Sequence, residues 1–339
     1  MAVPVRRALA VFLLLTIGMP VAAREACPFV RDPAFWARTA VPPAPAGELA
    51  VGTLNVFRLF DAEQDHSETQ VLTAQQFAAR IERIARYIAR DMGAPMLIGL
   101  QEIEDDTAAF ALTQALKRET GRDWRFVLGD VAGDGEIRNA LLVDARLRVM
   151  ATGSLFRRAP RAGKPLHDRL PLVVDIDAGA ILPAVGRFTA VVVHMKSQLG
   201  IDRPQDAERV IAKRKFQAEE LAGWTATQAG AGARLLVLGD FNAPALSAAA
   251  DIRAEPLRIL LAQGGLVDVA GNFLKPAQRW TYRYKCSLQE LDHLLVSPAL
   301  VKAVRGYAIV RGDTCIRARE KCSVTGSVSD HEGVVLKLR

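Results

Sequence analysis

Short apolar segments rich in β-branched residues recur along the chain, and their spacing constrains the fold more than any other feature. They occupy residues 48–59, 95–105, 124–130, 137–149, 170–178, 186–198, 234–241, 281–285, 291–297, 304–310 and 332–338. Some follow one another directly, as the strands of hairpins do, whereas others are separated by helical patterns, as in βαβ units. This mixture favours mixed sheets with helices outside over an all-parallel, doubly wound sheet.

Helical periodicity appears between these strand-like segments. Residues 72–93 place apolar side chains on one face, Thr73 with Gln76 resembles a capping box, and Gly93 marks a stop. Further helices are predicted over residues 106–121, 206–228 and 257–263. Because the chain has 339 residues, half of them hydrophobic, and no internal repeat or flexible linker, we predict a single domain over residues 49–339.

The N-terminal residues have a different character. Residues 1–23 combine Arg6 and Arg7 with an apolar run over 8–17, which is too short to span a membrane and is typical of an export signal cleaved after Ala23. A retained anchor and a lipoprotein are the alternatives. We therefore expect a periplasmic or secreted protein without stable membrane insertion after cleavage. Residues 24–48, rich in Pro and Ala, are expected to form a surface segment.

Export changes the interpretation of the cysteines. The mature chain would keep four, namely Cys27, Cys286, Cys315 and Cys322. An even number in an oxidising compartment predicts two disulfides, and four cysteines allow three pairings, of which a local Cys315–Cys322 link is favoured by proximity in the chain. No Cys-x-x-Cys motif is present, which speaks against a cysteine metal site.

The chain is basic, with a formal net charge of +7 that falls by two when Arg6 and Arg7 leave with the signal. The excess is concentrated in residues 157–164, 213–215 and 317–321. Each cluster by itself is most simply a solvated face, whereas together they favour a polyanionic partner.

Several apolar strands end in polar side chains, and this is the main functional signal. The residues concerned are Asn55, Glu102, His194 with Lys196, Asp240 with Asn242, Asp292, and Asp330 with His331. Because side chains two apart share one side of a strand, the pairs 194/196 and 240/242 are each expected to point together. An ordinary turn is the competing interpretation of Asp240 and Asn242.

Such a set suits hydrolysis of a phosphate ester if the strand ends converge. A divalent cation held by carboxylate and amide oxygens offsets the negative charge that protects the ester from attack. A histidine backed by a carboxylate is suited to proton transfer, and amide or lysine donors stabilise the charge that develops on phosphoryl oxygens.

Seven motifs carry a family resemblance, and they occur in order from residue 49 to the C-terminus: TLNV, LQEIED, IRNALLV, VVVHMKSQ, LGDFNAP, LDHLLVS and SDHEGVVLKL. The chain resembles the endonuclease/exonuclease/phosphatase superfamily, whose members are deoxyribonuclease I-like, and within it the secreted bacterial nuclease-like branch. This resemblance implies an α/β fold of the α+β type, a four-layered sandwich of two mixed β-sheets flanked by helices.

The resemblance also implies a role for each residue. Glu102, Asn55 and Asp330 would form the metal site, for Mg²⁺ or for Mn²⁺ or Ca²⁺; Asp240, Asn242, His194, His331 and its partner Asp292 would be catalytic; and Arg138, Lys196 and Arg169 would contact substrate phosphates. Two positions depart from the family pattern. Asn139 is followed by no aromatic residue where one is expected, and His293 stands where tyrosine is common. His66 and His167 lie outside the motifs and are expected to be structural or exposed.

We therefore expect an exported, metal-dependent phosphodiesterase, most simply a monomeric endonuclease that acts on DNA or RNA. A phosphoesterase for phospholipid or inositol phosphate head groups is the second hypothesis, although the sequence shows no exposed aromatic hairpin of the kind that a sphingomyelinase-like enzyme uses at a membrane. The third is a catalytically inactive binding protein of the same fold, against which the intact set of acidic and imidazole residues speaks. The sequence indicates no protein partner.

Overall fold

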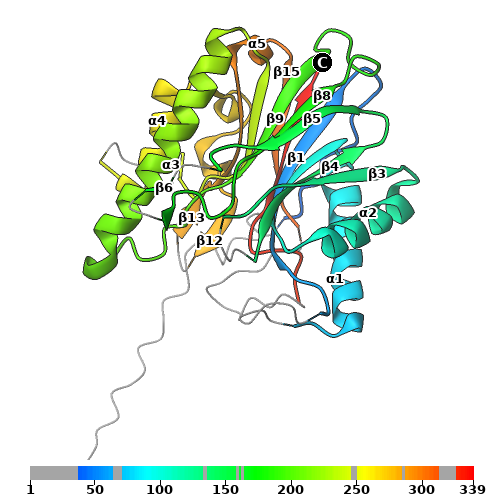
Figure 1. Cartoon of the computed structure of the whole chain (residues 1–339). Helices are drawn as coiled ribbons and strands as arrows, with labels where there is room; N and C mark the ends of the chain where they lie inside the picture. The colour runs from blue at the N-terminus through cyan, green and yellow to red at the C-terminus, as the bar shows by residue number, and fades with distance from the viewer. Residues whose placement is uncertain are drawn as a thin grey trace, which may run out of the picture.

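The computed structural model describes residues 37–63, 71–132, 136–157, 160–161, 164–245, 250–284, 287–312 and 326–339. These residues form two six-stranded mixed sheets packed face to face, with helices on both outer faces (Figure 1). The predicted four-layered sandwich of mixed sheets is therefore confirmed. Its halves follow one another in the chain, except that the last two strands return to the first sheet.

The first sheet has its one parallel pair at the centre, where β1 lies beside β2. In spatial order its strands are β15 (Val304–Val310), β16 (Gly333–Leu338), β1 (Leu49–Leu59), β2 (Leu97–Ile103), β4 (Arg138–Asp144) and β3 (Trp124–Leu128). The other neighbours in this sheet are antiparallel.

The second sheet also has a parallel pair at its centre, formed by β9 and β10. In spatial order its strands are β11 (Val267–Asp268), β14 (Asp292–Val296), β10 (Leu235–Asp240), β9 (Arg187–His194), β8 (Leu172–Asp177) and β5 (Arg148–Ser154). Two small antiparallel ribbons lie outside the sheets: β6 (Pro160–Arg161) with β7 (Lys164–Pro165), and β12 (Tyr282–Tyr284) with β13 (Ser287–Gln289).

Helices cover both outer faces (Figure 1). The first sheet carries α1 (Ala74–Arg86), the π-helical turn η3 (Tyr87–Asp91) and α2 (Asp106–Thr120), and the second carries α3 (Pro204–Gly230) and α4 (Glu255–Gln263). Shorter helical turns are α5 (Pro298–Val301), η4 (Ile252–Ala254), η5 (Ala270–Asn272) and η6 (Pro276–Gln278). The capping box of Thr73 and Gln76 is confirmed, and Asp105 caps α2.

Strand alternation divides the apolar residues into three layers. The central layer lies between the sheets and includes Val51, Leu97 and Leu238, all fully buried. The two outer layers pack each sheet against its helices, as Ile84 of α1 and Leu221 of α3 do. Each fully buried aliphatic side chain contributes about 1.5–3 kcal/mol, so these layers hold the strand ends in fixed positions.

Several predictions concern parts of the chain outside the described residues. These are the export signal of residues 1–23, His66, the basic cluster at 317–321 and all four cysteines. Residues 37–48 are mostly exposed, although Val41 is buried. No helix in the described part of the chain has the length and apolar character needed to cross a bilayer.

Candidate active site

Strand register places three predicted site residues in one row across the second sheet. Asp240 is the last residue of β10, and it pairs with His194 of β9 on one side and with Asp292 of β14 on the other. Because all three are buried, the row is a fixed part of the sheet and not a set of mobile loop residues. This explains why a buried strand ends in a carboxylate at Asp240.

Gly239 makes this row possible. Its φ of 141° is rare for residues with a side chain, and a Cβ atom there would lie 2.0 Å from the carbonyl oxygen of Val193. Glycine therefore lets β10 approach β9 closely, immediately before Asp240.

The first sheet presents its polar residues through irregular strand ends. The sequence predicted that strands end at Asn55 and at Gln101–Glu102, but β1 continues to Leu59 and β2 to Ile103. The pairing register shifts after Asn55 and again at Glu102, which has a φ of 68°. A bulge turns a side chain out of the regular alternation, and strained backbone of this kind is concentrated at functional sites.

The buried guanidinium of Arg80 supports the irregular part of β1. Arg80 lies on α1, is fully buried and donates to the carbonyl oxygens of Val56 and Phe57. Burial and repulsion from Arg83 lower the pKa of Arg80 to about 10, while attraction to Glu102 and Asp330 acts in the opposite direction. Arg80 thus also provides positive charge near two of the predicted metal ligands.

Asn55 joins the two sheets at the site. Its side-chain Nδ2 donates to Glu102 Oε1 at 3.1 Å and to Asp240 Oδ2 at 3.2 Å. Its Oδ1 accepts from the peptide N–H of Phe57, so in this arrangement Asn55 bridges the two carboxylates instead of offering an oxygen ligand. His194 Nε2 lies 3.5 Å from Asp240 Oδ2 and 4.0 Å from Glu102 Oε1.

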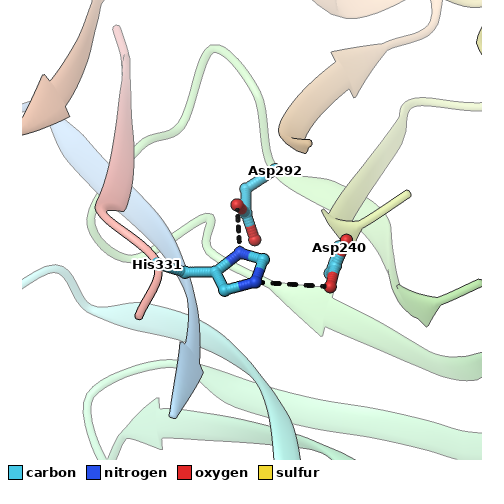
Figure 2. Close-up of side chains that lie close together, drawn as sticks. All are labelled: Asp240, Asp292 and His331. Carbon is cyan, nitrogen blue, oxygen red and sulfur yellow. Dashed lines mark hydrogen bonds and ion pairs between the residues drawn. The ribbon is translucent and has the colours of Figure 1, made fainter. Parts of the chain in front are cut away.

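His331 and Asp292 form a buried pair beside Asp240 (Figure 2). His331 Nδ1 lies 2.7 Å from Asp292 Oδ2, and its Nε2 points to Asp240 Oδ2 at 4.0 Å. Ser329 fixes the backbone here, because its Oγ donates to Asn55 O and accepts from the His331 N–H. One imidazole therefore stands between two carboxylates from neighbouring strands.

Electrostatics separates the protonation states of these groups. Burial lowers the pKa of His331, but attraction to Asp292 and Asp240 outweighs it and raises the pKa to about 10. Burial, with repulsion from Asp292, raises the pKa of Asp240 to about 7, against the attraction of His331 and two hydrogen bonds. At neutral pH His331 therefore carries its proton while Asp240 is close to its own pKa, so the two groups suit an acid and a base respectively.

His194 is held in the neutral form. Burial, with repulsion from Arg169, His331 and Lys196, lowers its pKa well below the usual value. Its Nε2 nevertheless lies close to the carboxylates of Asp240 and Glu102. A neutral ring with its proton on Nε2 is the tautomer that donates towards those carboxylates.

The donor set fits a divalent metal ion. Glu102 and Asp240 supply oxygen atoms side by side, and the ligand atoms of Asp240, Asp292 and His331 lie within 4.8 Å of one another. Among the residues that the structure describes, none forms a hydrogen bond with the buried Oδ1 of Asp292. Because His331 Nδ1 is already bonded to Asp292, the Glu102 side of the site, with its carboxylate partly exposed, offers the more available oxygen ligands.

Buried residues of α3 fix the segments that follow β9 and β10. Arg214 donates to the carbonyl oxygens of Lys196 and Asn242, and Gln217 Oε1 accepts from the Lys196 N–H at 2.7 Å. The sequence placed residues 213–215 in a solvated basic cluster, which is wrong for Arg214, since its exposed fraction is 2%. A buried arginine at this helical position gave no sequence signal, because its partners are backbone carbonyls far away in the chain.

The alternation argument for 194/196 and 240/242 is also wrong, because β9 ends at His194 and β10 ends at Asp240. Asn242 has a φ of 52°, and its N–H donates to Asp240 Oδ1 as in a turn. Its Nδ2 donates to Met195 O, and Lys196 Nζ bonds to Ser197. Both residues lie next to the site, but turns and not strand faces orient them.

The remaining predicted residues are placed less directly. Arg138 donates to the carbonyl oxygens of Glu104 and Gly129. Arg169 and Lys196 lie near enough to lower the pKa of His194, and Asp330 is buried beside His331. Their predicted contacts with phosphate and metal stay predictions.

The sequence predicted a strand over residues 281–285, but not that β12 pairs with β13 or that this ribbon borders the site. Thr281 Oγ1 accepts from the backbone N–H of Asp292, and the Tyr282 ring lies 4.7 Å from the His331 ring. Tyr284 on the same strand is 46% exposed. The alternating tyrosines of residues 281–285 were the available signal.

Comparisons with known proteins agree with this architecture. A family model described as the Endonuclease/Exonuclease/phosphatase family matches residues 52–331. Among solved structures, a family protein from Bacteroides thetaiotaomicron is similar with a TM-score of 0.56 and 15% identity, covering 87% of this chain and 98% of its own. No curated protein sequence matches the chain.

Two further solved structures are similar to the chain over most of its length. The 3′–5′ exonuclease NExo from Neisseria meningitidis has a TM-score of 0.55 and 17% identity, over 86% of this chain and 99% of its own. TDP2 from Caenorhabditis elegans has a TM-score of 0.55 and 14% identity, over 86% of this chain and 74% of its own. At these identities the similarity establishes the fold.

Proposed function

The chain belongs to the endonuclease/exonuclease/phosphatase family, and on that premise we propose that it is an exported, metal-dependent phosphodiesterase that hydrolyses nucleic acid. Metal-dependent phosphoester hydrolysis is the activity common to the family. The choice of nucleic acid rests on the basic net charge of the chain and on Arg169 and Lys196 beside the site. The NExo structures, one of them bound to a product DNA hairpin, are consistent with it.

One observation carries the catalytic proposal: Asp240 lies 4.0 Å from an imidazole that Asp292 keeps protonated. Asp240, with a pKa of about 7, is suited to take a proton from the attacking water near neutral pH. His331, as an imidazolium, is suited to give a proton to the leaving oxygen. The water oxygen bonds to phosphorus as the ester P–O bond breaks. One proton passes from the water to Asp240, and the other passes from His331 to the leaving oxygen.

The surrounding residues position the reacting groups and stabilise the charge of the phosphate. Glu102 and Asp330 would hold the divalent cation beside Asp240, and the cation would neutralise phosphate charge and polarise the P–O bond. Asn55 keeps Glu102 and Asp240 together, and the neutral ring of His194 lies with Nε2 3.5 Å from Asp240 Oδ2 without adding a second positive charge.

A panel of substrates tests the proposal. The purified mature chain is incubated with plasmid DNA, RNA, sphingomyelin vesicles and inositol phosphates, each with Mg²⁺, Mn²⁺ or Ca²⁺ and with a chelator. We expect cation-dependent cleavage of DNA or RNA that Asp240→Ala abolishes. Turnover of lipid or inositol phosphate without cleavage of any nucleic acid would support the second hypothesis. Absence of all hydrolysis would support an inactive binding protein.

Export has its own test. Residues 1–23 have the composition of a cleaved signal, so the protein expressed from the full sequence should be recovered outside the cytoplasm. Its N-terminal sequence should begin at Arg24. Recovery of the uncleaved chain from the cytoplasm would reject this part of the proposal.

A further inference from the structure

The β12–β13 ribbon, labelled in Figure 1, is attached to the segments of the catalytic pair by backbone contacts and by the Thr281 side chain. Tyr282 forms an antiparallel bridge with His331, and Thr281 O accepts from the N–H of Glu332. Thr281 Oγ1 also accepts from the N–H groups of Leu291 and Asp292. These contacts fix the ribbon relative to both members of the His331–Asp292 pair.

The two faces of β12 differ. Arg283 is buried, with its guanidinium 5.0 Å from the Trp280 ring and 3.4 Å from Glu332 Oε1. Strand alternation places Tyr282 and Tyr284 on the opposite face. Tyr282 is half-buried with its ring against the His331 imidazole, and Tyr284 is 46% exposed. An aromatic face therefore begins at the catalytic imidazole and continues to solvent.

Positive charge lies beside His194, the second imidazole of the site. Arg169 and Lys196 both lower the pKa of His194, which places their charges near that ring. The ribbon also reaches this region, because Gln198 Nε2 donates to Gln289 Oε1 at 2.9 Å. The site thus offers cations for an anionic backbone and an aromatic face for a flat, apolar group.

We infer that Tyr282 and Tyr284 form a stacking subsite for an unpaired nucleobase next to the scissile phosphate. This inference rests on the proposed function and specifies its substrate, a single-stranded or locally unpaired polynucleotide. Every nucleobase has a flat π-face, so stacking on tyrosine binds single strands without selecting a sequence. A base-paired, stacked nucleotide does not expose that face.

Membrane insertion is the competing use of an aromatic ribbon. The two residues that connect β12 to β13 are Lys285 and Cys286, neither of which is aromatic. One of the two tyrosines also lies against His331 and so faces the reaction centre. Both observations favour a group that lies in the site over an acyl chain of a bilayer.

Two polymers with the same charge test the inference. One is an oligothymidylate, and the other is an abasic deoxyribose–phosphate oligomer of equal length, so the two differ in their bases. We expect the wild-type protein with Mg²⁺ to hydrolyse the oligothymidylate with a KM at least about 10-fold lower, since stacking of one base provides that much. Tyr284→Ala should lose this preference, whereas Tyr284→Phe, which keeps the ring, should retain it.

A matched control is Phe110→Ala, which removes another exposed ring, 56% exposed, from α2 on the far side of the first sheet. It should keep the wild-type preference, and thermal melting should show that each variant is folded. Equal KM values for the two polymers in the wild type, or an unchanged preference in Tyr284→Ala, would overturn the subsite alone. Hydrolysis of sphingomyelin vesicles but of neither polymer would overturn the nucleic-acid function together with it.

Discussion

Asn55 and Asp240 are 185 residues apart in the chain, yet the side-chain amide of Asn55 donates to Asp240 Oδ2 at 3.2 Å. Asn55 belongs to the first sheet and Asp240 to the second, so this bond joins the two halves of the sandwich at the candidate active site. The same amide also donates to Glu102. Asn55 therefore holds together two carboxylates that would otherwise repel each other.

Replacing Asn55 with alanine should destabilise the cation-free protein by about 1–3 kcal/mol, because two buried or half-buried carboxylates lose their shared donor. Added Mg²⁺ should recover part of this loss by neutralising the carboxylates. Urea unfolding with and without Mg²⁺ measures both effects. Asn272→Ala, at an exposed position in η5, is the control and should change little. Equal stability of Asn55→Ala and wild type would show that the bridge is unimportant.

Asp292→Asn should change the pH dependence of hydrolysis. Asp292 raises the pKa of His331 to about 10, so its neutral replacement lets that pKa fall. The imidazolium is then lost at lower pH, and the alkaline limb of the kcat profile should move down. We also expect kcat to fall by at least about 10²-fold, as for the loss of an acid–base partner. Asp202→Asn, at an exposed surface pair, should leave the profile unchanged.

The sequence predicted the layers of the fold because they depend on local patterns. β-Branched runs and 3.6-residue periodicity identify strands and helices wherever burial is one-sided, and Thr73 with Gln76 even located the start of α1. The family motifs then ordered the strands. Bulges escaped prediction, since nothing in the local pattern at Glu102 distinguishes a strand end from a register shift.

The sequence predicted which residues form the site more completely than it predicted how they are arranged in space. His331 and Asp292 pair as expected, but the supports of the site escaped notice. Arg214 looked like part of a surface cluster, and Tyr282 like an ordinary strand residue. Both act through partners distant in the chain, and such long-range contacts leave no periodic or compositional trace in a single sequence.

Gly239→Ala should severely destabilise the protein. The new Cβ atom would lie 2.0 Å from Val193 O, and the φ of 141° disfavours alanine. Strands β9 and β10 would have to separate, which we expect to cost at least about 3 kcal/mol in the free energy of unfolding. Gly153→Ala is a matched control in β5, where a Cβ atom meets nothing within 4 Å. That variant should be neutral or stabilised by about 0.5–1 kcal/mol.

Cation binding should raise the melting temperature of the wild-type protein, since an ion that binds the folded state stabilises it by mass action. Glu102→Gln keeps the side-chain shape but removes a charge from the predicted ligand set. We expect the apparent affinity for Mg²⁺, obtained from the concentration dependence of Tm, to fall by about 10-fold. Differential scanning fluorimetry over a range of Mg²⁺ concentrations measures this. Glu219→Gln on the exposed face of α3 should bind like wild type, and an unaltered shift in Glu102→Gln would remove Glu102 from the metal site.

Chelation provides the corresponding test of activity. The proposed reaction depends on neutralising phosphate charge, so a chelator should abolish hydrolysis and added cation should restore it. Asp240 holds a proton with a pKa of about 7 in the cation-free protein. Binding of Mg²⁺ next to it should therefore release protons at neutral pH. Calorimetry in buffers of different ionisation enthalpy counts them, and no proton release would argue that the cation binds elsewhere.

His167 should make folding stability depend on pH. It is buried against Phe156, with ring centroids 5.0 Å apart, and its Nε2 lies 3.1 Å from Glu220 Oε2. Burial, with repulsion from Lys213, lowers the pKa of His167 to about 4 and outweighs attraction to Asp168. The neutral ring is therefore the form that the folded state accepts.

In the unfolded chain His167 regains an ordinary pKa of about 6.5, so the unfolded state binds more protons between about pH 6.5 and pH 4. Stability should accordingly be complete above that window and fall as the pH decreases through it, by about 3 kcal/mol in total. The glutamine of the His167→Gln variant cannot be protonated. The amount by which its free energy of unfolding falls below that of wild type should therefore shrink by about that amount over the same pH range. Denaturant unfolding of both proteins across this range measures the difference. A constant deficit would mean that His167 is not the titrating group, because every other ionisable residue is common to the two chains.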